Sequence, residues 1–100
     1  MISIAQRLEN ILKGARYGKG GYEVQLRLRD GGYLHFRHDP HTRWVQASQD
    51  GGIAPLLIGE IRQFELRGRR LEIWFGDDSR LIVRRGIFGL QAMASPPTPR

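Results

Sequence analysis

Apolar and polar residues alternate in a pattern that begins at Tyr22 and recurs along the chain. Because successive side chains of a strand point to opposite faces, a period of two predicts a strand with one buried face. The run Asp30-Gly31-Gly32 follows the first such stretch, and glycine accepts the positive φ of a tight hairpin turn. In this first stretch the apolar residues are Tyr22, Val24, Leu26 and Leu28, and the polar ones are Glu23, Gln25, Arg27 and Arg29.

The same pattern predicts further strands, each ended by a turn. They cover residues 33–37, 43–48, 70–75 and 80–85, together with a strand through Phe64 and Leu66 within 58–67. A helical turn near Ile58–Arg62 is the alternative at the start of that last stretch. Asp39-Pro40 interrupts the chain after residue 37, because proline cannot donate to a strand ladder.

The N-terminal residues have a period of 3.6 instead. Residues 3–13 predict a short helix with Ser3 as its N-cap and Gly14 as its stop. Residues 14–21 lack any period and predict a flexible loop. We expect the apolar patch at 87–90 to dock on the core, and residues 94–100, which contain three prolines, to form a frayed tail.

Short strands with no helices between them predict an all-β domain. We expect a small bent antiparallel barrel of five to six strands, Sm-like or SH3-like, with the helix 3–13 across one end. A single domain at residues 1–93 followed by the tail 94–100 accounts for the chain. The predicted core consists of Leu8, Leu12, Val24, Leu26, Leu28, Leu34, Phe36, Val45, Phe64, Leu66, Leu71, Ile73, Phe75, Leu81 and Val83.

Composition limits the function. The chain has 100 residues, no cysteine and a formal net charge of +6. The absence of cysteine excludes disulfide scaffolds, thiolate metal sites and cysteine nucleophiles, and it fits a reducing cytoplasm. The positive charge favours acidic partners such as nucleic acid, an anionic membrane or an acidic protein surface. No apolar run approaches the ~18 residues of a membrane span, and the N-terminus does not resemble a secretion signal. We therefore expect a cytoplasmic protein with no membrane partner.

Three short segments resemble the Sm-like (Lsm/Hfq) fold, in which an N-terminal helix caps a small five-stranded barrel. The run 24–31 is similar to the strand ending in Asp-Gly that opens the Sm1 motif, and 38–45 is similar to that motif's end. Leu66-Arg67-Gly68 resembles the Arg-Gly of Sm2. The resemblance spans about residues 3–75 and implies RNA binding and ring assembly through edge strands. The chain departs from the pattern where the base-reading Asn falls on Arg43 and the stacking position on Thr42.

One predicted face combines arginine with aromatic side chains opposite the apolar positions. Positive groups neutralise phosphates, flat rings stack on unpaired bases, and the guanidinium group does both. The alternative is an ordinary solvated face, since charged strand faces are common. The predicted nucleic-acid-binding residues are Arg27, Arg29, Tyr33, His35, Arg37, Arg43, Trp44 and Trp74.

Two other clusters carry chemistry-bearing side chains. All three histidines lie in the run 35–41, where a metal site competes with a turn capped by Asp39. Asp77-Asp78-Ser79 follows a glycine and is typical of a hairpin turn. No phosphate loop or nucleophile elbow is present in the sequence. We predict no catalysis, no cofactor and no metal.

The prediction is therefore a small non-catalytic module that binds RNA in preference to DNA, or single-stranded nucleic acid generally. The alternative is a protein-interaction or self-assembly domain, such as a homo-oligomer, with no nucleic-acid binding.

Overall fold

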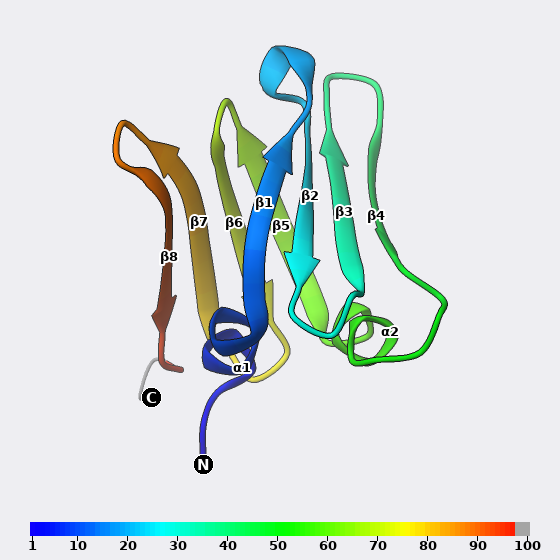
Figure 1. Cartoon of the computed structure of the whole chain (residues 1–100), viewed down its shortest axis with the longest axis vertical. Coiled ribbons are helices and arrows are strands. Elements are labelled where there is room, and N and C mark those ends of the chain that lie inside the picture. Colours follow the sequence, from blue (N-terminus) through cyan, green and yellow to red (C-terminus); the bar gives the residue numbers. More distant parts are fainter. Residues whose placement is uncertain (98–100) are drawn as a thin grey trace.

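Eight strands form two antiparallel sheets in the computed structural model, which describes residues 1–97. Each sheet is a four-stranded meander in which every strand pairs with its neighbours in sequence. The first four strands of the chain form sheet A and the last four form sheet B, and the two sheets pack face to face (Figure 1). Two short helices lie at one end of the molecule, and the hairpin loops at residues 18–22, 39–42, 68–69 and 87–88 lie at the other. We call these the helix end and the loop end.

The helix α1 (Ile4–Ile11) is anchored at its first turn. The hydroxyl of Ser3 accepts a hydrogen bond from the backbone N–H of Gln6 at 3.1 Å, which confirms the predicted N-cap. Two further N–H groups donate to the turn at residues 76–79: Ile4 to Asp77 Oδ2 at 2.9 Å and Ala5 to Ser79 Oγ at 3.1 Å. The turn at Asp77 and Ser79 therefore satisfies donors that a helix N-terminus leaves free.

Sheet A contains β1 (Leu12–Tyr17), β2 (Glu23–Leu28), β3 (Tyr33–His38) and β4 (Arg43–Ala47). A 3-10 turn at Lys19–Gly21 joins β1 to β2. The five-residue helix α2 (Ala54–Ile58) then leads into sheet B, which contains β5 (Ile61–Arg67), β6 (Arg70–Phe75), β7 (Arg80–Gly86) and β8 (Gly89–Ser95).

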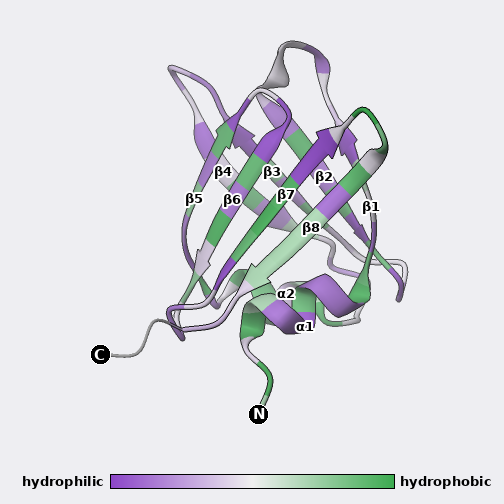
Figure 2. Ribbon diagram, turned by 90° about the vertical axis from the view of Figure 1, so that its left-hand side faces the viewer, coloured by the Kyte–Doolittle hydropathy of each residue, from purple (hydrophilic) through white to green (hydrophobic). Residues whose placement is uncertain are grey.

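The core lies between the two sheets, with α1 and α2 closing it at the helix end. Strands alternate apolar and polar residues along their length (Figure 2). Phe36 of sheet A and Phe64 of sheet B meet edge to face, with ring centroids 5.1 Å apart. Fourteen residues of the predicted core are buried; Val45 is only partly buried, and Ala5, Ala54 and Leu57 join the core.

The all-β class, the antiparallel pairing and the N-terminal helix are confirmed. The number of strands was wrong, since eight are present instead of five or six. Among residues 1–97 the pairing gives two separate sheets and no closed barrel. No helix in this part of the chain is long and apolar enough to cross a membrane.

Three local predictions were also wrong. The helix ends at Ile11 instead of residue 13, and the predicted loop 14–21 contains most of β1, because pairing with β2 gives this glycine-containing segment an extended partner. The patch 87–90 does not dock, because Ile87 and Phe88 are fully exposed. The tail prediction failed for residues 94 and 95, which belong to β8; residues 98–100 lie outside the described part of the chain.

Candidate nucleic-acid interface

The outer face of sheet A carries most of the predicted binding residues. Strand register places Arg27 of β2 directly opposite Tyr33 of β3. The next row across the sheet is Gln25, His35 and Gln46. Tyr33 is 37% exposed, and Arg27 is exposed beside it. This face therefore sets a guanidinium group next to an accessible ring, as contact with a phosphate and its base requires.

The aromatic side chains of this face form a row from β3 to β4. The rings of His35 and Trp44 meet edge to face with centroids 4.9 Å apart, so each fixes the orientation of the other. Tyr33 also lines a groove of about 660 Å³ between β4 and α2, whose wall includes Pro55 and Ile58. A groove with an aromatic side chain at its rim can accept a flat ring such as a nucleobase.

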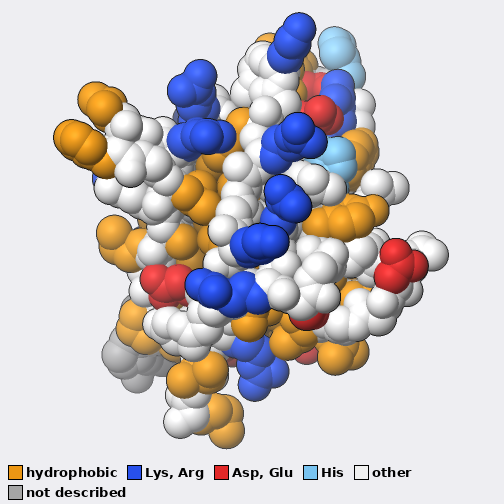
Figure 3. Space-filling view, in the orientation of Figure 1, with side chains coloured by type: hydrophobic (Ala, Val, Ile, Leu, Met, Phe, Trp, Pro, Cys, Tyr) orange, Lys and Arg blue, Asp and Glu red, His pale blue; other side chains and the backbone are white. Residues whose placement is uncertain are grey.

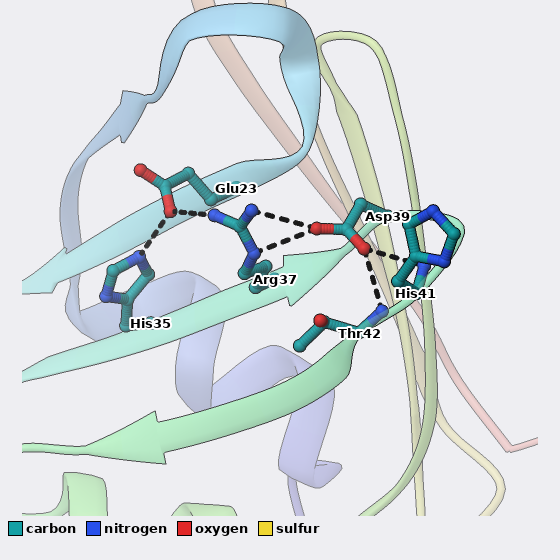
Figure 4. Close-up of polar contacts among 6 residues, drawn as sticks. All are labelled: Glu23, His35, Arg37, Asp39, His41 and Thr42. Carbon is teal, nitrogen blue, oxygen red and sulfur yellow. Dashed lines mark hydrogen bonds and ion pairs between the residues drawn. The ribbon is translucent and has the colours of Figure 1, made fainter.

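Arg37 is held by two carboxylates, as Figure 4 shows. Its Nη1 atom lies 3.1 Å from Glu23 Oε2, and its Nη2 atom lies 2.8 Å from Asp39 Oδ2. His35 Nε2 lies 3.7 Å from the same Glu23 oxygen. Because its charge is already neutralised, Arg37 contributes less to phosphate binding than the sequence suggests.

Asp39 caps the β3–β4 bend, in agreement with the turn alternative for the histidine run. Its Oδ1 atom accepts hydrogen bonds from the backbone N–H groups of His41 at 2.8 Å and Thr42 at 2.7 Å. The His41 bond is the largest influence on the pKa of Asp39. Together with the Thr42 bond and the Arg37 guanidinium it holds this pKa below its ordinary value, although burial acts in the opposite direction.

Two predicted residues lie away from this face, whereas a third, Arg29, borders it. Arg43 points toward sheet B, where it donates to the carbonyl of Phe64, lies 4.9 Å from that ring's centroid and pairs with Glu65 at 3.6 Å. Trp74 lies on the outer face of sheet B, between Gln63 and Arg80. Arg29 follows the end of β2 and is exposed, while its backbone N–H bonds to the carbonyl of Ile11.

The structure adds two cations that the sequence analysis missed, Lys13 and Arg16. Both are exposed on β1, and Arg16 lies opposite Gln25 of β2. The sequence predicts Lys13 at the end of the helix 3–13 and Arg16 in the loop 14–21, so neither is expected on a strand face. The inward residues Ala15 and Tyr17 are too few to produce a period of two. Lysine and arginine side chains form a band over β1 and β2 on this face (Figure 3). The cationic stripe, as we name it, consists of Lys13, Arg16, Arg27 and Arg29.

In the described part of the chain, no carboxylate forms an ion pair with the cationic stripe. Among the outward-facing residues of β1–β4, Glu23 is the one acidic side chain, and it forms an ion pair with Arg37. Free cations on a sheet face attract an anionic polymer and release its counterions on binding.

The histidine run does not gather into a metal centre. His35 points to the outer face of sheet A, whereas His38 lies on the inner side, with Nδ1 3.5 Å from Glu65 Oε2. In the described part of the chain, no three His, Asp or Glu side chains lie close enough together to hold a metal ion. Asp77 and Ser79 accept hydrogen bonds from the first turn of α1.

Comparisons of this chain with family models, with curated proteins and with solved structures find no match.

Proposed function

We propose that this protein is a non-catalytic nucleic-acid-binding module that takes a single strand, RNA in preference to DNA, on the outer face of sheet A. The cationic stripe contacts phosphates along β1 and β2. Tyr33 and Trp44 stack on bases, and His35 holds the Trp44 ring in place. The Sm-like resemblance, which stays a prediction, points to the same class of ligand.

The observation that carries this proposal is the pairing of free cations with aromatic side chains on one face. Arg27 and Tyr33 are cross-strand neighbours, so a phosphate on the guanidinium group leaves its base within reach of the ring. A sheet that presents rings to solvent binds single strands, whose bases are unstacked and available, better than duplexes.

Fluorescence anisotropy with labelled single-stranded RNA, single-stranded DNA and duplex DNA tests the proposal. At about 50 mM salt we expect the RNA to bind most tightly and the duplex most weakly, with affinity falling steeply toward about 200 mM. Tyr33→Ala should reduce affinity for RNA roughly tenfold, since stacking on one ring is worth about 1–3 kcal/mol.

The matched control is Tyr22→Ala. Tyr22 is also an exposed tyrosine, but it precedes β2 at the loop end and lies outside the proposed face. Equal loss in both variants, or no binding of RNA at low salt, would contradict the proposal.

A protein-interaction or self-assembly domain is the alternative, and one observation favours it. Each sheet leaves edge strands, β1 and β4 in sheet A and β5 and β8 in sheet B, that have a strand partner on one side only. Such edges can pair with another chain. A stable oligomer that binds no nucleic acid would support this function instead.

A further inference from the structure

The β7–β8 hairpin ends in two large apolar side chains that contact nothing in the core. Gly86 and Gly89 pair across the hairpin and leave Ile87 and Phe88 at its tip. These two side chains are 97% and 98% exposed, and the tip is the apolar, green end of the hairpin in Figure 2. Tight hairpin turns favour Asn, Asp and Gly, so turn formation does not explain an isoleucine and a phenylalanine here.

A basic cleft adjoins this tip. It has a volume of about 680 Å³ and lies between the β1–β2 loop, the β5–β6 turn and β7. Its charged lining residues are Lys19, Arg69 and Arg85, and the remainder of its wall is Tyr17 and the glycines 18, 20, 21 and 68. None of the residues that line it is acidic.

Contacts between the strands hold the cleft in shape. The backbone N–H of Arg85 donates to the carbonyl of Arg69 at 3.1 Å, and the hydroxyl of Tyr17 donates to the carbonyl of Val83 at 3.3 Å. Burial raises the pKa of Tyr17 to about 12, against the opposing charge of Arg85, so the hydroxyl keeps its proton. A Cβ on Gly21 would lie 2.9 Å from the Cα of Gly68, so glycine permits this close approach of the two loops.

Further arginines surround the tip and the cleft on sheet B. Register places Arg67, Arg70 and Arg84 side by side across β5, β6 and β7. Like charges directly opposite one another weaken a sheet, and within residues 1–97 Arg67 and Arg84 of this row have no carboxylate partner. The nearest acidic groups are engaged: Glu72 pairs with Arg80 at 3.0 Å and with Arg70 at 3.7 Å, and Glu23, next to Gly18, pairs with Arg37.

We propose that the loop end docks on the surface of an anionic phospholipid membrane. Ile87 and Phe88 insert among the acyl chains, and the cleft at Lys19, Arg69 and Arg85 receives the phosphate group of a lipid headgroup. This inference goes beyond the proposed function and concerns a different surface. It also departs from the sequence-based expectation of no membrane partner, which rested on the absence of a long apolar run.

The combination favours a membrane over the other anionic partners. Basic residues beside exposed apolar side chains are what interfacial anchors present, because the cations meet the headgroups while the apolar groups enter the boundary below them. A nucleic acid could stack on Phe88, but it offers no comparable environment for Ile87. The charge of the cleft complements an anionic headgroup, whereas an apolar protein groove would leave its three cations unused.

Vesicle sedimentation tests the proposal with the whole chain. Phosphatidylcholine vesicles are compared with vesicles that also contain phosphatidylserine, at about 0.15 M salt, where the Debye length is only about 8 Å. We expect the protein to sediment with the anionic vesicles only. The double variant I87S/F88S should weaken this partitioning about tenfold or more, since burial of a single large apolar side chain corresponds to that factor. R69S/R85S should weaken it severalfold.

The matched controls lie at the helix end. Leu56→Ser removes another exposed apolar side chain, 73% accessible on α2, and Arg7→Ser removes an exposed cation of α1. Neither should change the binding. Since I87S/F88S alters no buried residue, its thermal melt should match that of the unaltered protein.

Several results would overturn the inference. One is an absence of vesicle binding. Another is equal vesicle binding by I87S/F88S and by the unaltered protein, which would mean that net charge alone attracts the protein to the membrane. Inorganic phosphate provides a further arm: perturbation of Arg69 and Arg85 by phosphate without vesicle binding would make the cleft a site for free phosphate. Loss of RNA binding instead of vesicle binding in I87S/F88S would assign the tip to nucleic acid. Vesicle results leave the sheet A proposal untouched, because the variants share no residue with it.

Discussion

The outer faces of the two sheets have similar sequences but different electrostatic properties. Both carry several arginines, and each carries one tryptophan, Trp44 in sheet A and Trp74 in sheet B. In sheet B the carboxylate of Glu72 lies at the centre of the face and contacts Arg80 at 3.0 Å and Arg70 at 3.7 Å. In sheet A the centre of the face has no carboxylate.

Ion pairing with neighbouring carboxylates, more than the number of arginines, therefore decides where cationic charge is available. A guanidinium group held by a carboxylate offers a polyanion little net attraction, and release of the pair opposes binding. In the cationic stripe of sheet A, Arg16 and Arg27 retain their charge because their cross-strand neighbours are glutamine, glycine and tyrosine. We therefore expect sheet A to bind nucleic acid and sheet B to bind it weakly.

Removal of two stripe cations should have the largest effect. If Arg16 and Arg27 each contact a phosphate, R16S/R27S lowers the salt slope for single-stranded RNA by about 1.4 and the affinity at about 0.1 M salt by about 25-fold. Anisotropy at several salt concentrations measures both quantities. The control R70S/R80S removes two arginines of sheet B. It should lower the logarithm of the RNA affinity by less than about a third of the fall seen in R16S/R27S. Equal losses in the two variants would remove the distinction between the faces.

Sheet B should instead respond in its stability, because its β6–β7 turn anchors α1. Asp77→Ala leaves the N–H of Ile4 and the hydroxyl of Ser79 without their acceptor. We expect the free energy of unfolding to fall by about 1–3 kcal/mol, measured by urea denaturation. RNA affinity should stay unchanged, and a parallel loss of binding would show that α1 supports the sheet A face.

The same carboxyl predicts a pH dependence. Burial is the largest influence on the pKa of Asp77 and raises it, but bonds from the Ser79 hydroxyl and the Ile4 and Ser79 N–H groups outweigh it, so the pKa lies below its ordinary value of 3.8. A depressed folded-state pKa stabilises the protein above about pH 4, and this contribution disappears as the pH falls through the folded-state pKa. Melts of D77N and the unaltered protein should therefore converge below pH 4; a constant difference down to pH 2 would contradict this linkage.

Release of the sheet B arginines should have a smaller effect of the opposite sign. In the R16S/R27S background, Glu72→Gln frees Arg70 and Arg80 from their shared carboxylate. One additional phosphate contact raises affinity about fivefold at about 0.1 M salt. Anisotropy with the same RNA measures the gain, and the absence of any gain would show that pairing with Glu72 is not what keeps sheet B inactive.

The smallest effect is expected for the Arg37 ion pair. The double substitution E23Q/R37Q removes one charge of each sign, so the net charge stays the same. Because Arg37 lies between Glu23 and Asp39, these carboxylates already neutralise its charge. The double substitution should therefore change RNA affinity by less than about twofold. A loss comparable to that of R16S/R27S would restore Arg37 to the binding site that the sequence predicted.

Much of the fold could be predicted because strands with one buried face impose a period of two. That pattern located β2, β3, β6 and β7 and nearly the whole core. The same pattern did not locate β1 and β8, because their inward side chains are small. Their inward residues include Ala15, Ala92 and Ala94, which are too small to produce an apolar signal, and both segments are strands because a neighbour pairs with them. Pairing partners are not visible in a local pattern.

The sequence predicted which type of site sheet A carries, but not which residues belong to it. Alternation placed Arg27, Tyr33, His35 and Trp44 on one face. It could not show that register sets Glu23 opposite Arg37, because register depends on the whole hairpin. Nor could it show that Arg43 contacts Glu65, since those residues belong to different sheets.

The two tryptophans allow the most direct test of which face binds nucleic acid. Trp74→Phe leaves Trp44 as the one indole of the chain, and Trp44→Phe leaves Trp74. Stacking of a base on an indole quenches its fluorescence. Our account predicts that single-stranded oligouridine quenches the W74F protein in a saturable manner and leaves the emission of the W44F protein unchanged. Quenching of Trp74 with no change at Trp44 would contradict it and move the interface to sheet B.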